Sequence, residues 1–239
     1  MLPTQLPPIS EIAPGLFIGC FEASKDIKIL MNHDITAMVS LGQRRAKEWD
    51  RVGNRMLVAA ADHLIVPCTD MPGEDILAKL PDICDFIEAH LNAKPPRFAD
   101  LLLSAPDREM GCGLEDLNTS SYFAKHNVLV HCNLGISRSA TVVAAYLMRK
   151  RRQSRDQTLA YMRKKRRVQP IQNFLDQLQI WDEVEYFPWE DPGRTVPKEP
   201  YSIFLESSTP IHDYGRSVAF PILRLSLSAV EQLPPRPSV

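Results

Sequence analysis

The sequence predicts an α/β protein with a three-layer α-β-α architecture and a mainly parallel central sheet. Short apolar segments rich in β-branched residues alternate along the chain with longer segments of helical period. Parallel strands are usually joined by helical crossovers, so this alternation implies helices on both faces of the sheet. The length of 239 residues suits one domain with extensions, and 44% hydrophobic residues against 24% charged ones are ordinary for a globular protein.

Strands are expected where apolar runs are short and bounded by polar or turn-forming residues. Four segments have this character: residues 16–19, 35–41, 63–68 and 128–130. Residues 1–10 precede them, are Pro-rich, and are expected to form an extended N-terminal segment.

Helices are expected between these strands and after the last of them. Apolar residues recur with helical spacing between Ile76 and Leu91. Ser154 and Gln157 match a capping box, and Ser24 is a candidate cap for the first helix. The expected helices cover residues 24–33, 76–91, 139–152, 154–166 and 171–186.

Two segments interrupt the alternation. Residues 93–126 contain Pro95, Pro96 and Pro106, and are expected to be a lid, a docking element, a disordered loop or translated intron. Residues 189–239 hold eight of the 20 Pro and show no sustained period. The chain is therefore divided into the segment 1–10, a globular domain at 11–187 with an insertion at 93–126, and a Pro-rich tail at 188–239. The tail is expected to be mostly irregular, with a short strand considered near Ile203 or Val218.

The net charge of −1 argues against a nucleic-acid binder held by bulk positive charge. The balance conceals an asymmetry, because residues 149–167 carry ten Lys and Arg and a single acid, Asp156. Four interpretations stay open for this segment: a nuclear-import signal at residues 164–167, a kinase-docking surface, a guide for anionic substrates, and a solvated basic face of two helices.

The five cysteines are widely spaced and include no pair with zinc-ligand spacing. The N-terminal residues have neither a basic region nor an apolar core of a secretory signal. No apolar run reaches the roughly 18 residues of a transmembrane helix, so no membrane association is expected. We expect reduced thiols, a cytoplasmic or nuclear location, and neither a metal nor another cofactor.

One segment combines residue types that suit phosphate chemistry. The buried strand at 128–130 runs into Cys132, and Arg138 opens the following helix. Such a turn directs backbone N–H groups toward one point at a helix N-terminus, where the dipole favours an anion. Arg138 adds a bidentate fork for phosphate oxygens, and Gly135 permits a close backbone approach. The same field is expected to lower the pKa of Cys132, making its thiolate the nucleophile.

Two neighbours of this turn have expected supporting roles. Ser139 is positioned in sequence to donate a hydrogen bond to the thiolate or to the departing sulfur. His131 is expected to order the loop backbone and influence the thiolate pKa rather than to act as a base.

The pattern His131-Cys132-x-x-Gly135-x-x-Arg138-Ser139 resembles the signature of the cysteine-dependent protein tyrosine phosphatases. Its ending, Ser137-Arg138-Ser139, resembles that of the dual-specificity family. The length of the chain leaves no room for a regulatory rhodanese-like domain as well, so the resemblance is to the small single-domain atypical type. Residues 12–19 and 35–41 resemble the first core strands of that family, and Val168-x-Pro170 with Phe174 resembles its closing helix. The resemblance covers residues 11–187 apart from 93–126.

The resemblance implies hydrolysis of phosphotyrosine and phosphoserine or phosphothreonine through a cysteinyl-phosphate intermediate. It implies Asp70 as general acid and then base, with Asp75 as the second candidate. The residues expected to bind the substrate phosphate are Asn133, Leu134, Gly135, Ile136, Ser137 and Arg138. The alternatives are a phosphate-binding pseudophosphatase and a phosphoinositide or RNA phosphatase. The absence of Lys from the loop favours a phosphoprotein substrate.

The chain departs from the family pattern at several positions. Leu134 replaces a small residue and could narrow the pocket or alter its rim. Ile171 stands where the family commonly has Asn, and is expected to lose a polar contact under the loop. Asn173 stands in place of Gly, and is expected to tolerate a left-handed turn.

The expected partners are a phosphorylated protein substrate and, as a candidate, a protein kinase. No nucleic acid is expected, and the oligomeric state is open. Cys20, Cys68 and Cys84 are expected to be buried spectators; a protective disulfide with oxidised Cys132 is the alternative.

Overall fold

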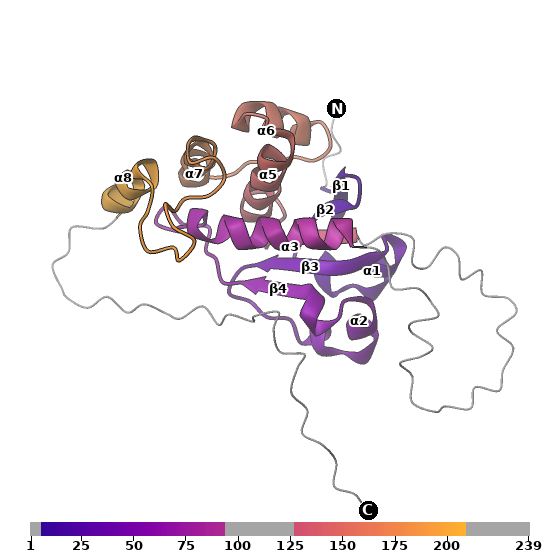
Figure 1. The fold of residues 1–239 in the computed structure, drawn as a ribbon. Coiled ribbons are helices and arrows are strands. Elements are labelled where there is room, and N and C mark those ends of the chain that lie inside the picture. The colour runs from indigo at the N-terminus through magenta and orange to yellow at the C-terminus, as the bar shows by residue number, and fades with distance from the viewer. Residues whose placement is uncertain (1–5, 94–126, 209–239) are drawn as a thin grey trace, which may run out of the picture. The chain divides into compact units, whose positions relative to one another are not determined.

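The computed structural model describes residues 6–93 and 127–208, which form an α/β unit around one five-stranded sheet (Figure 1). The strand order is β1-β2-β5-β3-β4, and the antiparallel pair among these strands is that of the edge strand β1 with β2. The other neighbours are parallel. The strands are β1 (Ile9–Ala13), β2 (Leu16–Gly19), β3 (Ile35–Leu41), β4 (His63–Val66) and β5 (Asn127–His131). The predicted fold class is therefore confirmed, and β5 lies at the centre of the sheet.

Helices cover both faces of this sheet, as Figure 1 shows for α3 above β3 and for α1 and α2 below it. The longer helices are α3 (Leu80–Asn92), α5 (Arg138–Arg151), α6 (Arg155–Arg163), α7 (Gln172–Glu183) and α8 (Glu199–Ser208). The short ones are α1 (Ile27–Asn32) and α2 (Val52–Leu57), accompanied by single 3-10 turns at Ala23–Lys25, Lys47–Asp50, Ala60–Asp62 and Leu77–Lys79. None of these helices in the described ranges is long and apolar enough to cross a membrane.

Side chains alternate between two hydrophobic cores, one on each face of the sheet. Val128 and Val130 of β5 belong to the larger core, which also includes residues of α3, α5 and α7. Leu129, between them, belongs to the smaller core with Leu30 and Met38. Successive strand residues point to opposite faces, so a strand buried on both sides reads as a continuous apolar run.

The predicted helices are present with shifted ends. The capping box at Ser154 is formed, because the Ser154 hydroxyl accepts from Gln157 N and the Gln157 side chain accepts from Ser154 N. Ser24 does not cap the first helix; the cap is Asp26, whose carboxylate accepts from Lys28 N and Ile29 N. Ser24 is buried instead, and its hydroxyl donates to the carbonyl of Phe21.

The boundary placed at residue 187 was too early, because the ordered chain continues through α8. The strand considered near Ile203 was wrong, since Ile203 lies in this helix. Pro200 is the second residue of α8, a position where the missing N–H would have no helical partner. Tyr201 and Phe204 are buried against the larger core. The predictions for residues 94–126 and 209–239, including a strand near Val218, concern residues outside the described ranges.

Candidate active site

Hydrogen bonds on its outer side fix the backbone orientation of the loop that joins β5 to α5. Each carbonyl from residue 132 to residue 136 has a hydrogen-bond partner outside the loop. The partners are His131 Nδ1 for Cys132, Phe21 N for Asn133, Arg166 for Leu134 and Gly135, and Gln169 N for Ile136. In a trans peptide the C=O and N–H point in opposite directions, so the N–H groups of residues 133–137 face the inner side. This geometry makes an anion-binding nest.

Gly135 is required at the tightest point of the nest. Its φ of 70° lies in the left-handed region, and a Cβ there would lie 2.5 Å from the carbonyl oxygen of Gly19. Both the conformation and the close approach exclude a side chain. The N–H of Gly135 points to Cys132 Sγ at 3.3 Å, which places the thiol at the base of the nest.

Cys132 is 3% exposed, and its Sγ lies 3.3 Å from Ser139 Oγ. Burial raises the pKa of the Cys132 thiol, but hydrogen bonds from Ser139 and Gly135 and the charge of Arg138 outweigh burial and hold the pKa below its ordinary value. Cys132, Ser139 and Gly135 thus have the mutual geometry expected of an activated thiolate.

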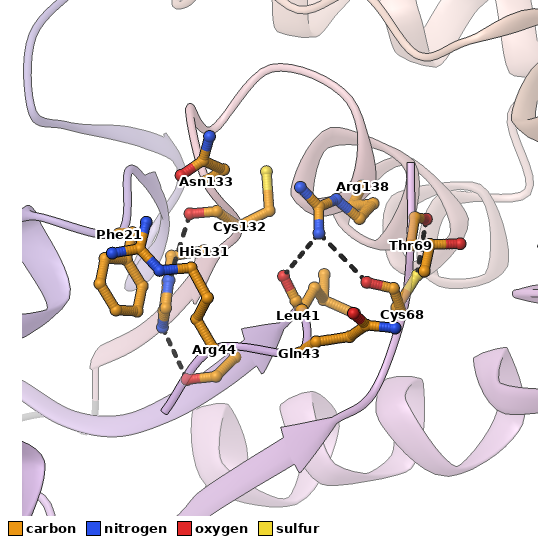
Figure 2. A pocket seen from close by; sticks show the side chains of 12 residues that line it. Phe21, Leu41, Gln43, Arg44, Cys68, Thr69, His131, Cys132, Asn133 and Arg138 are labelled. Atoms are coloured by element: carbon orange, nitrogen blue, oxygen red, sulfur yellow. Dashed lines mark hydrogen bonds between the residues drawn. The ribbon is translucent and has the colours of Figure 1, made fainter. Parts of the chain in front are cut away.

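Arg138 approaches the same space from the first turn of α5. Its Nη1 donates to the carbonyls of Cys68 at 3.1 Å and Leu41 at 3.4 Å, which fixes the guanidinium plane. Its Nε is buried and has no hydrogen-bond partner among the described residues. Figure 2 shows this guanidinium and the Cys132 thiol lining one pocket. A free, buried donor beside a nest suits an oxyanion.

Asp70 reaches the loop through Ser137, whose hydroxyl donates to Asp70 Oδ1 at 2.7 Å. Asp70 is exposed. Hydrogen bonds made by Glu74 and Gln177 hold the segment that carries it in place. Glu74 accepts from the N–H and the hydroxyl of Thr69 and pairs with Lys79. Buried Gln177 of α7 accepts from Ile76 N and Leu77 N and donates to the Glu74 carbonyl. These hydrogen bonds hold the Asp70 carboxylate at the rim of the nest.

The carboxylate of Asp75, the second candidate acid, makes its hydrogen bonds away from the loop. Its Oδ1 accepts from Ala78 N at 3.2 Å, and its Oδ2 accepts from Tyr201 Oη at 2.6 Å. These two contacts make Asp75 a cap for the helical turn before α3 and an anchor for α8. The structure therefore brings Asp70, but not Asp75, to the loop.

The two family departures at Ile171 and Asn173 have different outcomes. The Ile171 side chain is apolar and packs against the larger core, so it makes no polar contact under the loop, although its backbone N–H donates to Ser137 Oγ at 3.3 Å. Asn173 does not form a left-handed turn; it lies in α7 and donates from Nδ2 to the Glu74 carbonyl at 2.9 Å. Backbone and side chain of this segment thus support both the loop and the acid-bearing segment.

The pocket above the nest has a volume of about 270 Å³. Phe21, Arg44, Thr69 and Asn133 contribute to its wall, together with Cys132 and Arg138 (Figure 2). The Arg44 guanidinium lies over the Phe21 ring at 4.4 Å from its centroid. Leu134 does not narrow this pocket, because its side chain is 61% exposed and is not part of the wall.

Arg166 has a structural role in this site that the sequence analysis missed. Although it sits within the basic run at 164–167, it is 1% exposed. Its guanidinium donates to the carbonyls of Gly135, Leu134 and Pro7 and to Ser10 Oγ. An import signal that needs all four basic side chains at 164–167 exposed is not compatible with this burial. No local pattern distinguishes Arg166 from its exposed neighbour Arg167.

His131 is 2% exposed, and its Nδ1 lies 3.4 Å from the carbonyl of Cys132. Burial lowers the pKa of His131 to about 3, so the ring is neutral. Ser40 contacts the His131 ring from behind and in turn contacts His63, and the sequence analysis gave neither residue a role. Their position in the sequence could have indicated a role, because polar side chains inside strands that are buried on both faces need hydrogen-bond partners.

The other described cysteines are free thiols. Cys68 lines the same pocket as Cys132, but burial raises the pKa of its thiol to about 12. Cys84 is fully buried in α3, and burial raises its pKa to about 12 as well. Cys132 is the described cysteine whose pKa is lowered. Residues 6–93 and 127–208 contain no group of three acidic, His or Cys side chains arranged to hold a metal.

Comparison with known proteins agrees with this fold. The family model described as "Dual specificity phosphatase, catalytic domain" matches residues 119–184. Dual specificity phosphatase 28 of Mus musculus is 30% identical over 178 residues, which cover 74% of this chain and 85% of that protein. The crystal structure of human DUSP28 is 26% identical, with a TM-score of 0.53 over 74% of this chain and 95% of that one. The chain belongs to the dual specificity phosphatase family.

Other similar proteins are matched over different shares of their own length. Dual specificity protein phosphatase MPK-4 of Drosophila melanogaster is 30% identical over 72% of this chain, which spans only 36% of that protein. The Yvh1 phosphatase domain from Chaetomium thermophilum shares the fold, with 23% identity and a TM-score of 0.56 over 74% of this chain and 96% of that one. The human serine/threonine/tyrosine-interacting protein is 27% identical over 74% of this chain and 65% of its own length.

Proposed function

We propose that this protein hydrolyses phosphotyrosine and phosphoserine or phosphothreonine in proteins through a cysteinyl-phosphate intermediate. The observation that carries the proposal is the arrangement around Cys132 Sγ. The thiol has a lowered pKa, receives hydrogen bonds at the base of a nest of N–H groups, and lies beside the unpartnered Nε of Arg138. A nucleophile and the donors for the phosphoryl oxygens thus face the same point.

The reaction then follows in two displacements. The Cys132 thiolate attacks phosphorus while the bond from phosphorus to the substrate oxygen breaks, and Asp70 protonates that leaving oxygen. The Asp70 carboxylate next takes a proton from water as the water oxygen attacks phosphorus. The sulfur–phosphorus bond breaks, phosphate leaves, and Cys132 returns to a thiolate, to which Ser139 Oγ donates from 3.3 Å.

A protein substrate is supported by the composition of the pocket. The variable loop positions are Asn133, Leu134, Ile136 and Ser137, and none of them adds a positive charge for a polyphosphorylated headgroup. The wall contains Phe21, an aromatic surface against which a phosphotyrosine ring can pack. Relatives described as dual specificity phosphatases support the same class.

The test of the mechanism is Cys132→Ser assayed on an aryl phosphate with and without chelator. We expect turnover to fall below detection while phosphopeptide binding persists, because the nest and Arg138 are unchanged. Cys68→Ser is the matched control, since Cys68 lines the same pocket with a protonated thiol. Turnover that survives in Cys132→Ser would refute the assignment.

A panel of phosphopeptides, inositol phospholipids and triphosphate RNA tests the substrate class. We expect the highest kcat/KM on phosphopeptides. A higher kcat/KM on a lipid or on RNA would assign the protein to another substrate class of the same superfamily. If the wild type binds phosphopeptides tightly but turns over no substrate, the protein is a binding module instead.

A further inference from the structure

Three buried polar side chains from three neighbouring strands form a cluster behind the nucleophile. Ser40 Oγ of β3 lies 2.6 Å from His131 Nε2 of β5 and 2.7 Å from His63 Nε2 of β4. Their exposures are 3%, 2% and 9%. Trp49 covers the cluster, with its ring centroid 4.8 Å from that of His63 and 5.7 Å from that of His131.

The hydrogen bonds in this cluster have a direction, because a serine hydroxyl has one proton. Ser40 can donate to one histidine only and must accept from the other. Both rings are neutral, since burial lowers the pKa of His63 to about 4 and that of His131 to about 3. Each ring therefore carries one proton, and its position is decided by the partner on the opposite nitrogen.

Arg55 decides the direction. Its Nη1 lies 3.5 Å from His63 Nδ1, and a guanidinium can only donate. Nδ1 of His63 is therefore the unprotonated nitrogen, and Nε2 carries the proton and donates to Ser40. The Ser40 proton then points to His131 Nε2, which leaves the His131 proton on Nδ1, facing the carbonyl of Cys132. Asp50 holds Arg55 in place through an ion pair of 2.7 Å.

We propose that Arg55, His63 and Ser40 are positioning residues that fix the tautomer of His131 and, through it, the orientation of the Cys132–Asn133 peptide. In the other tautomer a lone pair of His131 Nδ1 would face the lone pairs of the Cys132 carbonyl. The repulsion would turn this peptide and move the N–H of Asn133 out of the nest. Arg55, His63, Ser40 and His131 thus form a hydrogen-bond relay, which stabilises the Cys132 thiolate from the side opposite the substrate.

This inference rests on the proposed function for its catalytic meaning, but its primary test needs no turnover. The probe is the ¹⁵N-labelled full-length protein, in which long-range ¹H–¹⁵N correlations report imidazole tautomers. We expect the Nε2–H form for His63 and the Nδ1–H form for His131. The reverse assignment in wild type would overturn the proposal. In Ser40→Ala we expect His131 to become a mixture of the two tautomers.

The second measurement is the pH midpoint of Cys132 alkylation, read for the Cys132 peptide by mass spectrometry. Loss of one neutral hydrogen bond should raise the midpoint in Ser40→Ala by about half to one pKa unit. Ser40→Thr keeps the hydroxyl and should restore it. Ser24→Ala is the control, because Ser24 is equally buried and accepts from Trp49 Nε1 but touches neither histidine.

The charged groups around the relay are unchanged in these variants. They are Arg138 and Arg166 near Cys132, and Arg45, Asp50 and Arg55 near His63. A midpoint in Ser40→Ala that moves no further than in Ser24→Ala would refute the relay. Absence of phosphatase turnover in wild type would refute the proposed function alone, since the tautomers and the alkylation midpoint are measured without substrate.

Discussion

The Nε of Arg166 donates to the carbonyl oxygen of Gly135 at 2.9 Å, although 31 residues separate them in the chain. The same guanidinium binds the carbonyl of Leu134, so one buried cation holds two consecutive peptides of the loop. Held in this way, the N–H of Gly135 points at the Cys132 sulfur. The orientation of the anion nest thus depends on a residue outside the signature.

Replacing Arg166 by Met should therefore damage both the fold and the nest. The carbonyls of Pro7, Leu134 and Gly135 would lose a buried donor, and each unsatisfied acceptor costs about 1–3 kcal/mol. We expect a markedly lower Tm and at least a roughly tenfold weaker affinity for vanadate, equivalent to about 1.4 kcal/mol. Thermal unfolding and vanadate inhibition measure the two effects.

Two further variants, one at Arg166 and one at its neighbour Arg167, sharpen that prediction. Arg166→Lys keeps the charge but not the planar fork, and should recover only part of the affinity. Arg167→Met removes the exposed neighbour and should leave both quantities near wild type. Equal losses in the Arg166 and Arg167 variants would contradict the role given to Arg166.

Asp70→Asn should lower kcat by about a hundredfold or more on phosphoserine peptides, whose poor leaving group needs a proton. The effect should be smaller on an activated aryl phosphate. Asp75→Asn is the control, because this carboxylate contacts Ala78 N and Tyr201 rather than the loop. It should reduce Tm and leave kcat largely unchanged. A catalytic loss confined to Asp75→Asn would exchange the two assignments.

Truncation of the C-terminal region should measure what α8 contributes to stability. A chain ending at residue 208 keeps α8 and should retain the Tm of the full chain. A chain ending at residue 187 loses buried Tyr201 and Phe204 and exposes the core beneath them. We expect it to be less stable by several kcal/mol, since burying one large side chain contributes about 1.5–3 kcal/mol. Urea unfolding of both chains measures the difference, and equal stability would show that α8 contributes nothing.

Stability should fall as the pH is lowered from 7.5 to 5. The pKa of His63 is about 4 and that of His131 about 3 in the folded protein, both below the ordinary 6.5. The unfolded chain therefore binds more protons in this window, and each histidine removes about 2 kcal/mol of stability by pH 5. Their contribution is fully present above pH 6.5. In His63→Gln the slope should be about half as steep, and an unchanged slope would contradict the buried neutral state.

The sequence alone predicted the features that depend on neighbouring residues. The alternation of strands and helices follows from local hydrophobic periodicity, and the capping box at Ser154 needs only residues three apart. The loop from Cys132 to Arg138 carries its nucleophile, its glycine and its arginine within one turn, so its chemistry was visible in one line of sequence.

Other features depend on residues that only folding brings together. Arg166 is one of several consecutive basic residues, and the space between Gly135 and Ser10 determines which of them is buried. Ser40 and His63 become a relay because β3, β4 and β5 are parallel neighbours in register. The sequence analysis missed α8 because its segment is rich in proline, whereas the helix is stabilised by packing of Tyr201 and Phe204 in the larger core and by contact with α7. Local sequence determined which chemistry the loop can carry, whereas tertiary contacts, which no local pattern encodes, decided which distant side chains orient it.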